Sequence, residues 1–119
     1  MNKIGIEIQG KRYLAELEES SVSSEIQKQF PLSLILNRSG SNEYYNSLPK
    51  KIKTASKGTS HVQAGYIYYF AGSNAFSLNF ADLNISPFEV VKIGYVDDES
   101  LIQMLSTGPK SIEVNIFLL

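Results

Sequence analysis

Residues 61–80 read HVQAGYIYYFAGSNAFSLNF, and this stretch decides the fold class of the chain. Its first half is rich in aromatic residues, and its second half alternates Phe76, Leu78 and Phe80 with Ser77 and Asn79. An apolar residue at every second position is typical of a β-strand with one buried face. The intervening Ala-Gly-Ser-Asn favours a turn. The stretch therefore predicts one β-hairpin.

The two ends of the chain show the same alternation. Residues 3–9 place three isoleucines on one face, and residues 110–118 place four branched apolar residues on one face. Both terminal strands are therefore expected within a sheet. Further strands are expected at 12–18, 32–36 and 89–96, with short helices from Ser20 or Ser21 to about Phe30 and from Asp97 or Asp98 to about Ser106.

The segment before the hairpin has the weakest pattern. Residues 37–42 favour a turn, Tyr44 and Tyr45 favour a short edge pairing, and residues 50–60 form a polar loop. A loop of this length is often functional, although a mobile surface connection is the simpler interpretation. About seven strands and two short helices predict a mainly β fold. We expect a closed or nearly closed antiparallel barrel, because closure removes exposed strand edges.

The composition predicts a single domain over residues 1–119 and argues against several chemistries. A formal net charge of −1 gives no general attraction for nucleic acid or for an anionic membrane. Without cysteine the chain has no disulfide, no thiolate nucleophile and no cysteine-ligated metal. No glycine-rich nucleotide loop occurs, so no cofactor is expected. The lack of an apolar targeting segment favours a cytoplasmic location.

Four short motifs follow one another along the chain: Phe30-Pro31-Leu32-Ser33-Leu34, Leu48-Pro49, His61 with Gly65 four residues later, and Ile93-Gly94-Tyr95-Val96-Asp97-Asp98. In order and spacing they resemble the bacterial cyclophilin-like family of small β-barrels, over nearly the whole chain. Members of that family usually carry Gly-Asp at the start of the aromatic strand. This chain carries Gly65-Tyr66 there, so no role of that aspartate is transferred. The family is named for its barrel, so the resemblance implies a fold rather than a function.

The resemblance also bears on prolyl isomerase activity. Prolyl isomerase cyclophilins use an arginine followed shortly by Phe-Met-x-Gln-Gly-Gly-Asp, beside an apolar pocket for proline. Here Arg12 precedes Tyr-Leu, Arg38 precedes Ser-Gly, and Gly-Gly-Asp does not occur. The resemblance therefore implies a cyclophilin-type barrel without the recognised isomerase site, and no catalytic residue is predicted.

Three polar features have both a structural and a functional interpretation. His61 is the only histidine, but Ser60 and His61 point to opposite sides of an extended chain and are not expected to form a catalytic pair. The acidic residues 97–99 favour a helix N-terminus over a cation site, and no metal site is expected. The lysines within residues 50–57 favour a solvated loop over a nucleic-acid site.

The aromatic arm of the hairpin is the candidate binding surface. Tyrosines suit both the packed wall of a barrel and the lining of a ligand groove, and the sequence leaves open which strand face is outward. Residues 37–60 must return to the hairpin at His61, so a loop is expected beside one end of the arm. We therefore predict a ligand site made by His61, Tyr66 and Tyr68.

These features together predict a non-catalytic domain that binds a peptide or a small molecule. A divergent prolyl isomerase is one alternative, and an accessory domain for a larger partner protein is another. Neither nucleic acid nor a membrane is expected as a partner.

Overall fold

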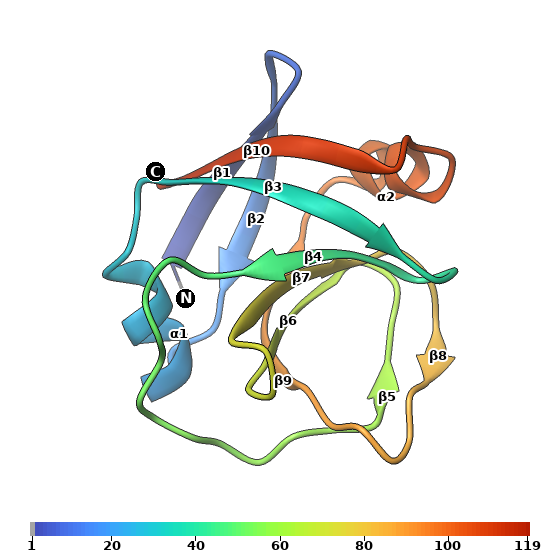
Figure 1. Ribbon diagram of the computed structural model, residues 1–119. Helices are drawn as coiled ribbons and strands as arrows, with labels where there is room; N and C mark the ends of the chain where they lie inside the picture. Colours follow the sequence, from blue (N-terminus) through green and yellow to red (C-terminus); the bar gives the residue numbers. More distant parts are fainter. Residues whose placement is uncertain (1) are drawn as a thin grey trace.

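Eight strands close into an antiparallel barrel in the computed structural model, which describes residues 2–119 (Figure 1). The strand order around the barrel is β1-β10-β3-β4-β7-β6-β9-β2, and β5 and β8 form a separate two-stranded ribbon. This architecture confirms the predicted closed barrel with two helices. In chain order the elements are β1 (Asn2–Ile8), β2 (Lys11–Leu17), α1 (Ser21–Gln27), β3 (Leu32–Ser39), β4 (Glu43–Ser47), β5 (His61–Val62), β6 (Tyr66–Phe70), β7 (Ala75–Asn79), β8 (Leu83–Asn84), β9 (Val91–Val96), α2 (Glu99–Ser106) and β10 (Ser111–Leu118).

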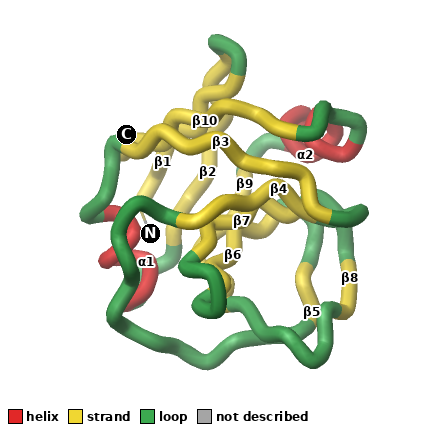
Figure 2. The backbone as a smooth tube through the Cα atoms, in the orientation of Figure 1, coloured by secondary structure: helices red, strands yellow, loops and turns green. Residues whose placement is uncertain are grey.

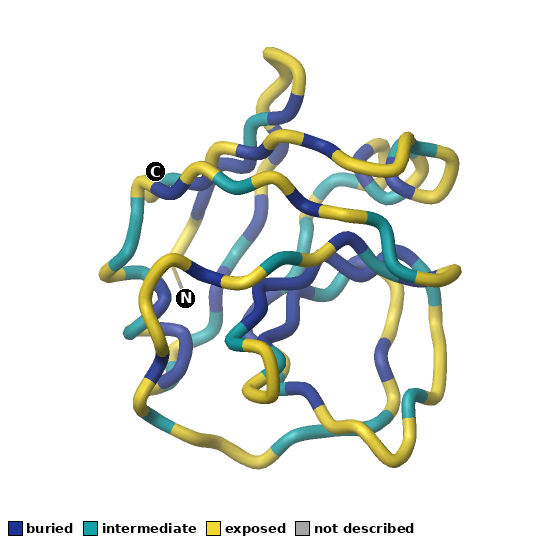
Figure 3. Tube along the Cα trace, viewed as in Figure 1, coloured by how far each residue is buried: buried dark blue, intermediate teal, exposed yellow. Residues whose placement is uncertain are grey.

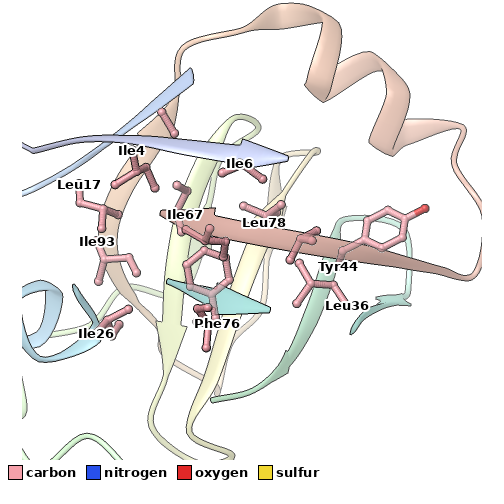
Figure 4. Close-up of a cluster of buried hydrophobic side chains, with 14 of the residues drawn as sticks. Ile4, Ile6, Leu17, Ile26, Leu36, Tyr44, Ile67, Phe76, Leu78 and Ile93 are labelled. Carbon is pink, nitrogen blue, oxygen red and sulfur yellow. The ribbon is translucent and has the colours of Figure 1, made fainter. Parts of the chain in front are cut away.

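Both terminal strands lie within the barrel, as the alternation predicted, and the structure places them side by side. Strand β1 pairs with β10, and Ile6 lies opposite Ile116. Ile6, Val114 and Ile116 are completely buried, because alternate residues of each strand point into the barrel. Figure 4 shows the side chains of Ile4, Ile6, Leu17, Ile67 and Leu78 within this shared interior.

Both helices begin at the predicted caps. The Ser20 hydroxyl accepts a hydrogen bond from the Ser23 amide at the start of α1, and the Asp98 carboxylate accepts one from the Ser100 amide at the start of α2. Helix α1 ends at Gln27, earlier than the predicted end near Phe30. The amides of Gln29 and Phe30 bond to carbonyls three residues back, so the last turn is tighter than an α-helix.

Strands β3 and β4 correct the prediction for residues 37–47. β3 continues to Ser39, so the turn begins only at Gly40, where φ is 58°. Asn37, Arg38 and Ser39 pair with Tyr45, Tyr44 and Glu43. β4 also pairs with β7, so Tyr44 and Tyr45 belong to an internal barrel strand and not to an edge.

The predicted hairpin is divided into two parts. Its true arms are β6 and β7, joined through the predicted turn at residues 71–74. The extended strand is interrupted before β6 at Gly65, whose φ of 88° lies in the left-handed region that favours glycine. His61 and Val62 therefore form β5, which pairs with β8.

The long polar segment after β4 has no regular secondary structure in residues 48–58 and is largely exposed (Figures 2 and 3). Its backbone is nevertheless bonded to neighbouring elements. The Glu25 carboxylate accepts the amides of Lys53 and Thr54, and these bonds lower the pKa of Glu25. The Ile52 side chain is buried in the barrel core. The loop is therefore attached to α1 and to the barrel core at these points.

Neither helix within residues 2–119 has the length and apolar content required to cross a membrane.

Candidate functional site

A groove of about 450 Å³ lies on the outer surface of the barrel. One wall is formed by β4, β7 and the end of β6. The opposite wall is formed by residues 85–90, the connection between β8 and β9. The lining is largely apolar and aromatic, with Tyr45, Phe70 and Phe88 as its rings and Glu43 as its charged group.

Strand alternation explains why the barrel wall presents these side chains. Tyr44 and Phe76 are completely buried in the core, so their strand neighbours point outward. Glu43 and Tyr45 therefore face the groove from β4, and Ser77 faces it from β7. Tyr45 lies directly opposite Ser77 in the β4–β7 pair, which brings the two strands' contributions together.

The opposite wall is held by hydrogen bonds to the segment just before β5. The Ser60 hydroxyl donates to the Phe88 carbonyl at 2.8 Å, and the backbones of Thr59 and Val90 exchange two hydrogen bonds. The Phe88 ring meets the Phe70 ring edge to face, with centroids 6.2 Å apart. Phe88 is nevertheless 61% exposed, so most of its apolar surface is open to solvent.

Glu43 has an unusual environment for a carboxylate. Its Oε1 accepts a hydrogen bond from the Ser77 hydroxyl at 2.7 Å. Partial burial raises the pKa of Glu43, and the Ser77 hydrogen bond opposes this rise. A raised pKa in the folded state means that the stability contributed by this group is present at low pH and is lost as pH rises through that pKa. Ionised Glu43 therefore opposes folding near neutral pH.

His61 is exposed and lies on β5, outside the groove lining. Its backbone amide donates to the Thr59 hydroxyl at 3.1 Å. The Ser60 hydroxyl donates to Phe88 instead, and no hydrogen bond joins Ser60 to His61 within residues 2–119.

Tyr66 and Tyr68 lie together on the outer face of β6, with ring centroids 6.4 Å apart. Tyr68 is 2% exposed and packs with Val62 and Val90, and its hydroxyl accepts the Gln63 amide. Burial raises the pKa of Tyr68. Tyr66 is half-buried beneath the Lys92 ammonium. The structure thus groups the two tyrosines next to the groove but outside its lining, and a ligand at His61, Tyr66 and Tyr68 stays a prediction.

Asp98 and Arg38, two polar residues weighed in the sequence for a cation site and for isomerase activity, have structural roles. Asp98 caps α2, and the Ser100 side chain is the first cause of its lowered pKa. Arg38 donates to the carbonyls of Leu105 and Ser106 at the C-terminus of α2, at 2.7 and 2.9 Å. Its guanidinium also lies over the Phe80 ring, 4.6 Å from the centroid. The Arg38 guanidinium therefore caps the C-terminus of α2, where the helix dipole favours a cation.

Sequence reasoning missed Glu43, Tyr45 and Phe88 as site residues. Glu43 and Tyr45 flank the buried Tyr44, so recognition of β4 as a barrel strand would have placed both on its outer face. Phe88 lies in an irregular segment, and no periodic pattern gives its direction. Phe70 does belong to the predicted aromatic arm and joins that arm to the groove.

The order of strands in this closed barrel, with a helix at each of two connections, defines a cyclophilin-type architecture. The model of the cyclophilin-like family matches residues 6–117, and this chain belongs to that family. The structure is similar to the solution structure of a hypothetical protein from Archaeoglobus fulgidus. The TM-score is 0.76 at 20% identity, over 99% of this chain and 95% of that one. No curated protein matches the sequence.

Proposed function

We propose that this chain is a non-catalytic binding domain whose groove takes a small molecule or a short peptide segment. The observation that carries the proposal is the pair of exposed aromatic side chains at the groove, Phe88 at 61% and Tyr45 at 37% exposure. The volume of about 450 Å³ lies in the range of small-molecule sites. An apolar lining with few polar groups is typical of such sites.

The two walls differ in construction, which also supports binding. The barrel wall consists of paired strands, whereas residues 85–90 are attached through a few bonds to Thr59 and Ser60. A rigid surface facing an irregular segment is a common arrangement for recognition. A ligand that covers Phe88 recovers roughly 2 kcal/mol for a fully buried ring, which is enough to contribute measurable affinity.

The first test is amide shift mapping with a pool of aromatic fragments. We expect saturable shifts at the amides of Tyr45, Ser77 and Phe88, and we expect Phe88→Ser to weaken binding by about tenfold or more. Leu83→Ser is the matched control, because Leu83 is 39% exposed on the neighbouring ribbon but does not line the groove. Shifts confined to His61, Tyr66 and Tyr68 would move the site to the positions predicted from the sequence. A pool that gives no saturable shift contradicts the proposal.

A second prediction concerns prolyl isomerisation. We expect no acceleration of cis–trans exchange in a proline peptide, as measured by exchange spectroscopy. The guanidinium of Arg38 is engaged at the end of α2, and that of Arg12 lies over the Phe117 ring at 4.8 Å, so neither is directed at the groove. Turnover that disappears in Arg12→Ala or Arg38→Ala would identify a divergent isomerase and its arginine. Turnover that survives both changes would contradict the prediction and would show that isomerase activity here does not depend on either arginine.

A further inference from the structure

Glu43 has fewer bonds than several other partly enclosed carboxylates, and unlike Glu7 and Glu16 it lines the groove. Glu25 accepts two backbone amides, Asp98 caps a helix, and Glu18 pairs with Lys92 at 3.2 Å. Glu43 accepts a single hydrogen bond, from the Ser77 hydroxyl to Oε1. Within residues 2–119, neither an ion pair of Glu43 nor a hydrogen bond to its Oε2 is present.

The free oxygen of Glu43 is accessible to solvent. Every fully buried side-chain nitrogen or oxygen among the described residues has a hydrogen-bond partner. Because Oε2 has none, it must retain accessible surface, and Glu43 is a lining residue of the groove. A half-buried carboxylate without a counter-charge costs stability, and such groups concentrate at functional sites.

We propose that the groove binds a small organic ammonium ion, with the N–H group donating to Glu43 Oε2 and the apolar body resting on Phe88 and Tyr45. This inference rests on the proposed binding function and names its ligand class. A charged donor compensates a desolvated carboxylate better than a neutral one, because charge-assisted hydrogen bonds are roughly twice as strong. The faces of aromatic rings also attract cations.

The geometry favours an ammonium over a guanidinium. A guanidinium binds a carboxylate best through two parallel N–H bonds, one to each oxygen. Ser77 already uses one acceptor position of Oε1, which disfavours a parallel pair of bonds and leaves Oε2 as the oxygen without a partner. An ammonium acts as a point donor and needs only that oxygen. The groove volume of about 450 Å³ suits a small molecule more closely than an extended polymer segment.

The test compares three probes that share a phenylethyl body by calorimetry near neutral pH: 2-phenylethylamine, 2-phenylethanol and phenylethylguanidine. We expect the amine to bind about tenfold or more tightly than the alcohol, and more tightly than the guanidine. In Glu43→Gln the affinity for the amine should fall to that for the alcohol, while the affinity for the alcohol stays unchanged. Glu89→Gln is the matched control, because Glu89 is exposed within the wall of residues 85–90 but is not among the residues that line the groove.

The outcomes separate the inference from the proposed function. Equal binding of amine and alcohol leaves the binding function standing and overturns the ammonium assignment. If the guanidine binds more tightly than the amine, the preference for an ammonium over a guanidinium is wrong. If a lysine-containing hexapeptide binds more tightly than the amine, the ligand is not a small molecule. Failure of all probes, including the aromatic pool, counts against the binding function itself. Glu43→Gln should melt no lower than the parent chain, since it removes a charge whose burial is unfavourable, so loss of binding is not loss of fold.

Discussion

Ile6→Asp is expected to abolish the cooperative unfolding transition. Ile6 is completely buried and lies between its partners Ile116 on β10 and Tyr13 on β2. An aspartate there buries a charge without a partner and removes apolar contacts. The cost is about 4 kcal/mol or more, a large part of the 5–15 kcal/mol that stabilises a typical domain. Val114→Asp should have the same effect from the paired terminal strand.

The control for this prediction lies on the same strand as Val114. Ser111 is exposed on β10, so Ser111→Asp adds the same charge without burying it and should change stability by less than about 0.5 kcal/mol. Circular dichroism during thermal and urea unfolding measures all three variants. A cooperative transition in Ile6→Asp or Val114→Asp at the parent midpoint would show that the terminal strands do not share the core.

Gly94→Ala is expected to disrupt the junction of three strands. Gly94 on β9 pairs with Leu17 on β2 and with Ile67 on β6. A Cβ at this position would overlap the carbonyl oxygen of Glu16 and would lie 3.1 Å from the Leu17 Cα. Both are backbone atoms held by strand pairing, so they cannot move aside cheaply. We expect a loss of about 3 kcal/mol in the free energy of unfolding.

Gly10→Ala provides the comparison for this prediction. Gly10 lies in the turn between β1 and β2, and a Cβ there would meet no atom within 4 Å. Its φ of 80° still disfavours alanine, at a cost of roughly 1–2 kcal/mol. Urea unfolding midpoints should therefore rank Gly94→Ala clearly below Gly10→Ala. The reverse order would mean that the β2–β9 contact is looser than described.

The parts of the fold that were predictable have a periodic pattern and one buried face. The isoleucines of β1 and the apolar residues of β10 alternate over their whole length, so direction and burial follow from the spacing alone. β4 was underestimated because only Tyr44 among its five residues is buried. β5 and β8 contain two residues each, too few to show any period.

The candidate site depends on contacts between distant parts of the chain. Glu43 and Ser77 are 34 residues apart, and their hydrogen bond requires the β4–β7 pairing. The outward face of β6 was left open by the sequence, and tertiary structure decides it by placing Ile67 and Tyr69 in the core. The exposure of Phe88 results from bonds between residues 59–60 and 88–90. None of these relations has a local sequence signal.

The wall formed by residues 85–90 has a consequence for how such barrels diversify. Its attachments are to Thr59 and Ser60, and the cluster beneath it, around Val62, Tyr68 and Val90, is separate from the main core. Substitutions and length changes in this wall therefore leave the residues that close the barrel untouched. Natural variation or directed evolution can therefore change ligand preference through residues 85–90 with little effect on folding.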